Sequence, residues 1–329
     1  MINVKTHGRI GILGNPSDMY NGVVISSTIN NLFVEGTIKK ANEFEFLLNN
    51  SLDESLNNLV KSTLLLLDRK KCRFDKFKYH VQTKIPKQAG LAGSTAIIVN
   101  LIKGLNQLCS LGLDPMKIAH YTRKVEHEII GNTAGPQDCF VVLFGGIKYM
   151  DFSSGNYKSF ILEDIDISDI PFYVGVRCKN VSSGDIHKYP FEAYPNSPEL
   201  QTIVNKIGSC AIEGREAILN KDLKKIGELM NSNQKLTQSY GKFGDPTESV
   251  ILQRKIDQEI LDYCNEHEVI GAKLGGSSGS IIILDEGKPD FLLDYKPHPD
   301  LLKELEKYDS SSSENQISQV IKLKPAKAN

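Results

Sequence analysis

The segment IPKQAGLAGSTAIIVNLIKGL, residues 85–105, joins a proline and a run of small residues to a long apolar stretch. Side chains are small or absent at the point where the apolar stretch predicts a helix to begin, at Gly90, Ala92, Gly93 and Ser94. A helix N-terminus carries unpaired backbone N–H groups and the positive end of the helix dipole, so it can bind an anion. Bare backbone lets a phosphate approach closely, and the Ser94 hydroxyl is a suitable metal ligand. The segment therefore suggests a phosphate site.

These residues also have a purely structural interpretation, because small side chains let a helix pack tightly against a strand. The segment is not a Walker A loop, since it lacks the lysine of GxxxxGK[ST], and it is not GxGxxG. The loop by itself leaves both interpretations open.

Composition limits the class of protein. A chain of 329 residues suits about two domains. The formal net charge of −1 provides no global field for nucleic acid or an anionic membrane. No stretch approaches the ~18 apolar residues of a membrane span. The six cysteines form no CxxC pair, which predicts free thiols in a reducing compartment and no zinc site. We expect a cytoplasmic protein without a membrane or nucleic-acid partner.

The first half of the chain shows mixed strand and helix signals. Strands are expected where short apolar or alternating runs lie between turn formers, at 9–14, 32–40, 43–48 and 78–86. Ser51 and Glu54 have the spacing of a capping box that opens a helix. Further helices are expected from Ser94, from Asp114-Pro115 to about Gly131, and just before a turn at Gly145-Gly146.

The second half opens with a strand at 171–178, and a glycine-serine turn within 271–284 leads into a β-branched strand. Three helix starts are marked by Ser197-Pro198, Lys221-Asp222 and Asp245-Pro246. Because strands and helices mix without a regular βαβ rhythm, the pattern predicts an α+β fold in two domains, 1–165 and 166–329.

Three segments together resemble the three motifs of the GHMP kinases. They are GILGNPSDMYNG (11–22), PKQAGLAGSTA (86–96) and GAKLGGSSGS (271–280); the middle motif of the superfamily reads roughly P-x-x-x-G-L-x-S-S-x-A. Two more segments, 134–153 and 221–233, are similar to the glucuronokinase branch of the superfamily. The matches run from residue 9 to about 280.

This resemblance implies a fold and a nucleotide site. The N-terminal domain would resemble domain 2 of ribosomal protein S5, and the C-terminal domain would be ferredoxin-like, with ATP between them. The resemblance places the ATP phosphates on Pro86, Lys87, Gln88, Ala89, Gly90, Leu91, Ala92, Gly93, Ser94 and Thr95. It implies that Ser94 and Glu126 hold Mg²⁺. An extra residue near Ile129-Ile130 makes Glu128 a competitor for this role, and either glutamate has the alternative of a solvated helix-face charge.

The resemblance also implies the residues of phosphoryl transfer. Asp138 matches the aspartate that faces the acceptor hydroxyl, either as general base or to orient that hydroxyl, although it can also be an N-cap. Arg9 matches a basic residue near the transferred phosphate, unless it is simply solvated. The expected sugar contacts are Asn15, Asp18, Tyr20 and Gly276, of which the first three also suit plain turns.

The implied activity is an ATP- and Mg²⁺-dependent sugar kinase that makes glucuronate 1-phosphate. A carboxylate substrate needs a cationic partner, for which the sequence offers Arg177, Lys179 and Lys188. The segment Ser182–Gly184 is either a second substrate loop or a plain solvent loop. The alternatives are another acceptor, such as heptose 7-phosphate, galactose or galacturonate, or a catalytically silent binding protein. We expect a monomer or homodimer.

Overall fold

The computed structural model describes residues 1–67, 76–133, 135–155, 160–177, 183–276, 279–308 and 315–327, except for the side chains of 183–185. Within this part of the chain, the strands form a seven-stranded and a four-stranded sheet. Mixed helices and sheets agree with the predicted α+β class.

The first half of the chain supplies the seven-stranded sheet. Its strands are β1 (Ile2–Leu13), β2 (Val23–Ala41), β3 (Glu45–Leu48), β4 (Ser51–Leu52), β5 (Lys76–Thr83), β6 (Ile147–Asp151) and β7 (Ile161–Asp164). Strand β2 pairs antiparallel with β1, β5 and β6, so it forms the centre of the sheet, whereas β3 joins β5 in parallel. A short 3-10 helix, Ser17–Tyr20, connects β1 to β2.

Helices from the first half cover this sheet, some by direct contact with its strands and some by packing on other helices. They are α1 (Glu54–Leu66), α2 (Gly93–Cys109), α3 (Pro115–Lys124), a π-helical turn (Val125–Ile129) and α4 (Gln137–Phe144). Helix α2 lies against β1 and β2 with its apolar residues buried on most sides, as the sequence predicted. Its N-terminus lies beside the middle of β1, where Arg9 N donates to Leu91 O at 3.1 Å.

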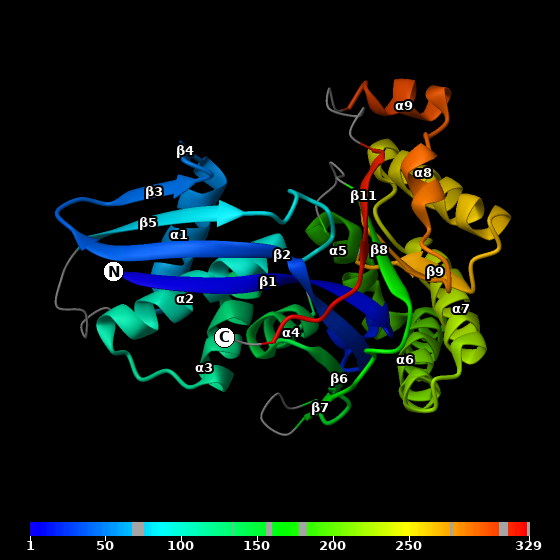
Figure 1. Cartoon of the computed structure of the whole chain (residues 1–329), viewed down its shortest axis with the longest axis horizontal. Coiled ribbons are helices and arrows are strands. Elements are labelled where there is room, and N and C mark those ends of the chain that lie inside the picture. The colour runs from blue at the N-terminus through cyan, green and yellow to red at the C-terminus, as the bar shows by residue number, and fades with distance from the viewer. Residues whose placement is uncertain are drawn as a thin grey trace.

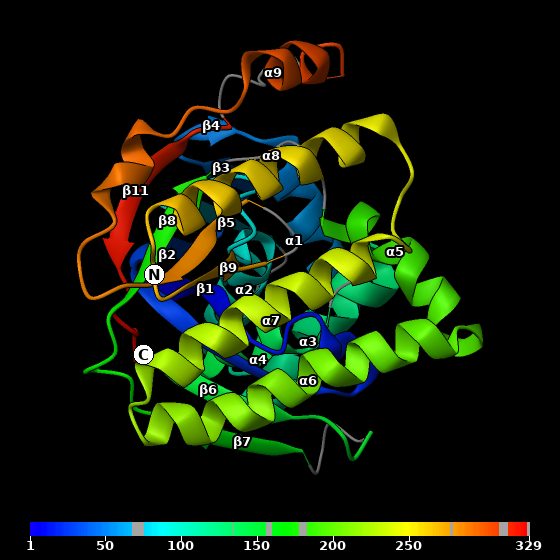
Figure 2. The ribbon, with the colours of Figure 1, turned by 90° about the vertical axis from the view of Figure 1, so that its right-hand side faces the viewer.

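The second half supplies the smaller sheet and the longest helices. The strands are β8 (Phe172–Arg177), β9 (Gly271–Leu274), β10 (Ile281–Leu284) and β11 (Ile317–Lys322), in the antiparallel order β11-β8-β10-β9. The helices are α5 (Ser183–Ala193), α6 (Pro198–Leu219), α7 (Leu223–Gly241), α8 (Glu248–Glu266) and α9 (Pro299–Leu305). Helices α7 and α8 pack on β9. Figure 1 shows the two halves side by side, and Figure 2 shows α6 beside α7.

Most predicted helix starts are confirmed, and two are wrong. Asp114, Ser197 and Asp222 each cap a helix through a side-chain oxygen that accepts a backbone N–H. The capping box at Ser51 is wrong, because Ser51 pairs with Leu48 in β4 and Asp53 caps α1 instead. Asp245 accepts from Thr247 N in a turn, so α8 begins only at Glu248.

The predicted boundary near residue 165 does not separate two independent cores. One continuous cluster of buried apolar residues includes Ile10 and Val99 from the first half and Phe172, Met230 and Ile282 from the second. The chain also returns to the first sheet after β11, where Gly146 N donates to Ala326 O at 2.6 Å. The division at 165 therefore stays a prediction.

Two predictions concern thiols and membranes. Cys139, Cys210 and Cys264 are free thiols, as expected. Cys109 is disulfide-bonded, so the expectation of free thiols is wrong there; spacing along the sequence does not reveal which cysteines meet in space. Among the described residues, no helix has the length and apolar character to cross a bilayer.

Candidate active site

The loop before α2 lines a large cavity. Ala92 is the N-cap of α2 in the left-handed conformation, with φ 56°, and no side chain caps the helix. Gln88 and Gly90 also have positive φ, of 54° and 72°. Such alternation of backbone conformations turns successive N–H groups toward one side and favours anion binding. This loop lines a cavity of about 760 Å³, and Ser94, in the first turn of α2, is not its N-cap.

The glycine-rich segment after β9 packs against the backbone of this loop. Ser280 N donates to Ala89 O at 2.9 Å. A Cβ on Gly276 would lie 2.5 Å from Gly90 O, and one on Gly279 would lie 2.7 Å from Ala89 O. The first and third motifs also join, since Gly11 N donates to Gly275 O at 2.7 Å. The backbones of the two segments approach so closely that side chains in place of these glycines would not fit. This contact holds the loop in position.

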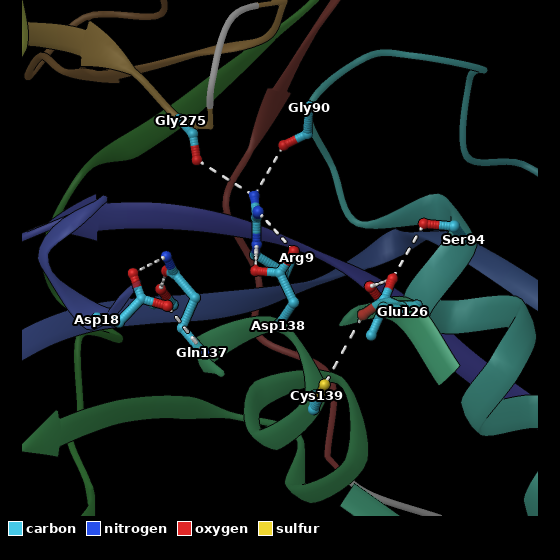
Figure 3. A network of polar contacts seen from close by, with 11 residues as sticks. Arg9, Asp18, Gly90, Ser94, Glu126, Gln137, Asp138, Cys139 and Gly275 are labelled. Carbon is cyan, nitrogen blue, oxygen red and sulfur yellow. Dashed lines mark hydrogen bonds and ion pairs between the residues drawn. The ribbon is translucent and has the colours of Figure 1, made fainter. Parts of the chain in front are cut away.

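Arg9 and Asp138 form a bidentate ion pair beside the loop (Figure 3). Arg9 Nε donates to Asp138 Oδ1 at 2.5 Å, and Nη2 donates to Oδ2 at 2.8 Å. Nη1 donates to Gly90 O at 2.7 Å and to Gly275 O at 3.3 Å. One guanidinium thus connects β1, α4, the loop and the third motif.

The Arg9 side chain stays charged in the site although it is buried. Burial disfavours the Arg9 cation, yet the adjacent Asp138 carboxylate outweighs it and raises the pKa of Arg9 above its ordinary value. Arg9 is buried, so the alternative of a solvated arginine is wrong. Asp138 is not an N-cap either, because α4 begins at Gln137 with Pro136 as its N-cap.

Glu126 faces the start of α2, as Figure 3 shows. Its Oε1 accepts from Thr95 Oγ1 at 2.7 Å and from Ser94 Oγ at 3.2 Å. Burial, together with the charge of Asp138, raises the pKa of Glu126 to about 7. The extra residue in this region is absorbed by the π-helical turn, which leaves Glu126 buried and Glu128 exposed.

The donor set at Glu126 suits Mg²⁺ better than zinc. A carboxylate and a hydroxyl are hard oxygen ligands, and Mg²⁺ usually takes one or two protein carboxylates together with substrate phosphates. Among the described residues, no cluster of three or more His, Cys, Asp or Glu side chains forms an all-protein metal site. An incoming cation would favour the ionised form of Glu126.

A second cavity, of about 190 Å³, also borders the Arg9–Asp138 pair and is further lined by Asp18 and Gly276. Asp18 is fully buried; its carboxylate accepts from Gln137 N at 3.1 Å and from Gln137 Nε2 at 2.9 Å. Burial raises the pKa of Asp18 to about 7. Arg9 and Asp138 are the ionisable pair that borders both cavities.

Asn15 also lines this smaller cavity, and a buried lysine holds it in place. Lys273 Nζ donates to Asn15 Oδ1 at 2.8 Å and to Leu274 O at 2.7 Å. Burial lowers the pKa of Lys273 to about 7. Sequence reasoning missed both Gln137 and Lys273, although each lies within a quoted motif; a charged residue inside a buried strand was the available signal for Lys273.

Tyr20 approaches the smaller cavity only through Tyr240. The Tyr20 and Tyr240 hydroxyls lie 2.9 Å apart, and the Tyr240 hydroxyl is 3.1 Å from His187 Nδ1. Tyr240 and His187 line the cavity, whereas Tyr20 packs among Phe191 and Tyr194. The structure therefore brings Asn15, Asp18 and Gly276 to the cavity but not Tyr20.

Two of the three cations predicted for a substrate carboxylate, Arg177 and Lys188, do not line the smaller cavity. Arg177 is fully buried, pairs with Asp257 and donates from Nε to Gly279 O at 3.1 Å, so it is wrong as a substrate contact. Lys188 is exposed and does not line the cavity. Lys179 and Ser182 lie outside the described residues, as does the side chain of Ser183.

Comparison with known proteins identifies the family. A profile described as GHMP kinases N terminal domain matches residues 58–146. Glucuronokinase 1 of Arabidopsis thaliana is 30% identical over 322 residues, covering 86% of this chain and 84% of the plant protein. Galactokinase of Pyrococcus furiosus is 24% identical, covering 87% of this chain and 90% of that protein. The chain belongs to the GHMP kinases and is a phosphotransferase with an alcohol group as acceptor.

Solved structures show the same fold. Leishmania major mevalonate kinase in complex with R-mevalonate gives a TM-score of 0.69 at 15% identity, over 100% of this chain and 97% of that chain. A D-glycero-D-manno-heptose 1-phosphate kinase from Bacteriodes thetaiotaomicron gives 0.66 at 17% identity, over 99% and 98%. The predicted GHMP kinase fold is confirmed.

Proposed function

We propose that this protein is a sugar kinase that uses ATP and Mg²⁺ to phosphorylate D-glucuronate at its anomeric hydroxyl. The choice of acceptor is supported by the 30% identity to Glucuronokinase 1. The observation that carries the phosphoryl-transfer chemistry is the Arg9–Asp138 pair, which borders both cavities. A donor in the larger cavity and an acceptor in the smaller one would meet at this pair.

The larger cavity is the proposed nucleotide site. The ATP phosphates would lie on the backbone from Pro86 to Thr95, at the uncapped N-terminus of α2. Ser94 and Glu126 would hold Mg²⁺. When bound, this ion neutralises charge on the β- and γ-phosphates.

Asp138 is the proposed partner of the acceptor hydroxyl. As the hydroxyl oxygen forms its bond to the γ-phosphorus, the bond between that phosphorus and the ADP oxygen breaks. The hydroxyl proton then passes to the Asp138 carboxylate, which either acts as base or receives the proton late. The positive charge of Arg9 stabilises the negative charge that develops on the transferred phosphoryl group.

The smaller cavity is the proposed sugar site. Asn15, Asp18 and Gly276 line it, and Asp18 and Asn15 are held by Gln137 and Lys273. In this proposal, residues 1–165 form the ATP-binding domain and 166–329 the C-terminal domain, which closes the sugar site.

A second candidate is a GHMP kinase for another acceptor. Similarity to galactokinase of Pyrococcus furiosus and to D-glycero-alpha-D-manno-heptose 7-phosphate kinase of Campylobacter jejuni supports this alternative. A catalytically silent binding protein is disfavoured, because the residues expected to act in phosphoryl transfer are all present and close together. Arg9 pairs with Asp138, and the charges of both act on Glu126.

The test is ADP release with Mg-ATP against glucuronate, galacturonate, glucose, galactose, mannose and heptose phosphates. A kcat/KM for glucuronate far above that for every other sugar is the expected result. Turnover of another sugar would keep the kinase but replace its substrate. Bound ATP without turnover of any sugar would favour the silent protein.

A further inference from the structure

Two arginines among the described residues line the smaller cavity, and they differ in their partners. Arg9 is held by Asp138. Arg254, on α8, forms no hydrogen bond or ion pair within the described part of the chain, and its Nη2 atom is buried. A guanidinium that lines a cavity and has no acceptor in that part of the protein can take an anionic ligand there.

Gly244 leaves room for the Arg254 side chain at the cavity wall because it carries no Cβ. A Cβ on Gly244 would lie 2.1 Å from Arg254 Nη2, and one on Gly241 would lie 3.7 Å from Nε. The nearby acid Asp257 pairs with Arg177 instead. Burial lowers the pKa of Arg254, against the opposing attraction of Asp245 and Asp257. No neighbour therefore neutralises this cation closely.

We propose that Arg254 binds the carboxylate of the acceptor sugar and thereby selects uronates over neutral sugars. A planar guanidinium matches a carboxylate in a bidentate geometry. Arg254 lines only the smaller cavity, whereas Arg9 and Asp138 border both, so one sugar can present its hydroxyl to Asp138 and its acidic group to Arg254. This inference rests on the proposed function and gives it a determinant of substrate class.

The experiment compares acceptors that differ only in a carboxylate or a hydroxymethyl group: glucuronate with glucose, and galacturonate with galactose. Glucose 6-phosphate tests a different anion. The variants are Arg254→Gln, Arg254→Lys and the matched control Lys255→Gln, which removes an exposed charge from the next position of α8. Steady-state kinetics with saturating Mg-ATP gives kcat/KM for each acceptor.

We expect Arg254→Gln to lower kcat/KM for the uronate roughly 10- to 100-fold, through KM, and to change the neutral partner little. Arg254→Lys should keep part of the preference, and Lys255→Gln all of it. The melting temperature of ligand-free Arg254→Gln should not fall, because the variant removes a half-buried cation without a partner. A merely structural role would lower that temperature and affect both acceptors equally.

The outcomes separate this inference from the substrate assignment. If glucuronate is turned over and Arg254→Gln keeps the wild-type uronate preference, Arg254 is the wrong residue and the proposed function stands. If galacturonate is the substrate and the variant loses the preference, the inference stands and the glucuronate assignment fails. Preference of the wild type for neutral or phosphorylated sugars, or no turnover at all, overturns the inference.

Discussion

The two cavities that meet at Arg9 and Asp138 are built in different ways. More than half of the residues that line the larger one are consecutive in the chain, from Thr83 to Thr95. The smaller one collects side chains from β1, α4, α7 and α8, including Arg9, Gln137 and Arg254. The first is a local structure, and the second exists only when distant segments come together.

This difference matches what each ligand requires. Phosphate groups are common to all nucleotides and can be bound by backbone N–H groups, which any sequence of small residues exposes. An acceptor sugar has to be distinguished from similar molecules, which takes side chains of defined charge at defined places. We therefore expect substitutions on the two sides to change different kinetic constants.

The largest effect is expected where the two cavities meet. Asp138→Ala should lower kcat by ~10²- to 10⁴-fold and leave ATP affinity nearly unchanged, because the loss concerns a proton acceptor and not the nucleotide site. Single-turnover kinetics and ATP titration measure both. Near-normal turnover would remove Asp138 from the mechanism.

On the nucleotide side, Glu126→Gln should raise the Mg²⁺ concentration needed for half-maximal activity, roughly 10- to 100-fold, because it removes the buried carboxylate beside Ser94. Glu128→Gln, at an exposed position two residues away, is the matched control. Equal Mg²⁺ requirements in the two variants would contradict the assignment of Glu126.

A smaller effect is expected from the backbone support of the loop. Gly279→Ala should raise KM for ATP roughly tenfold and leave KM for the sugar unchanged, because the new Cβ meets Ala89 O. Gly112→Ala is the control: it imposes a similar positive φ, of 69°, where nothing lies within 4 Å. A comparable rise in both variants would mean that backbone strain alone explains the result.

The smallest effect is a pH dependence of stability on the acceptor side. The pKa of Lys273 falls from 10.5 to about 7 on folding, so the unfolded chain binds a proton that the folded chain lacks between those pH values. The free energy of unfolding of the wild type should therefore rise relative to that of Lys273→Met as the pH rises from 7 to 9. Urea unfolding of both proteins at each pH measures the gap, and a constant gap would contradict the lowered pKa.

Sequence reasoning worked best where a local rule decides the structure. Asp114, Ser197 and Asp222 cap the helices that they were predicted to cap, because the cap is made by residues three positions away. The rule failed at Ser51, where pairing with β3 took the residue into a strand. The choice between Glu126 and Glu128 depended on a π-helical turn, which residue spacing does not predict.

By itself, the sequence determined the small-residue helix start, the order of the three motifs and the family, because these depend on neighbouring residues. Only the tertiary structure decided which charges face a ligand. It buried Arg177 against Asp257, left Arg254 at the cavity wall, and placed Lys273 behind Asn15. The free energy of a charge depends on burial and on partners far along the chain, so only the folded protein distinguishes a binding arginine from a structural one.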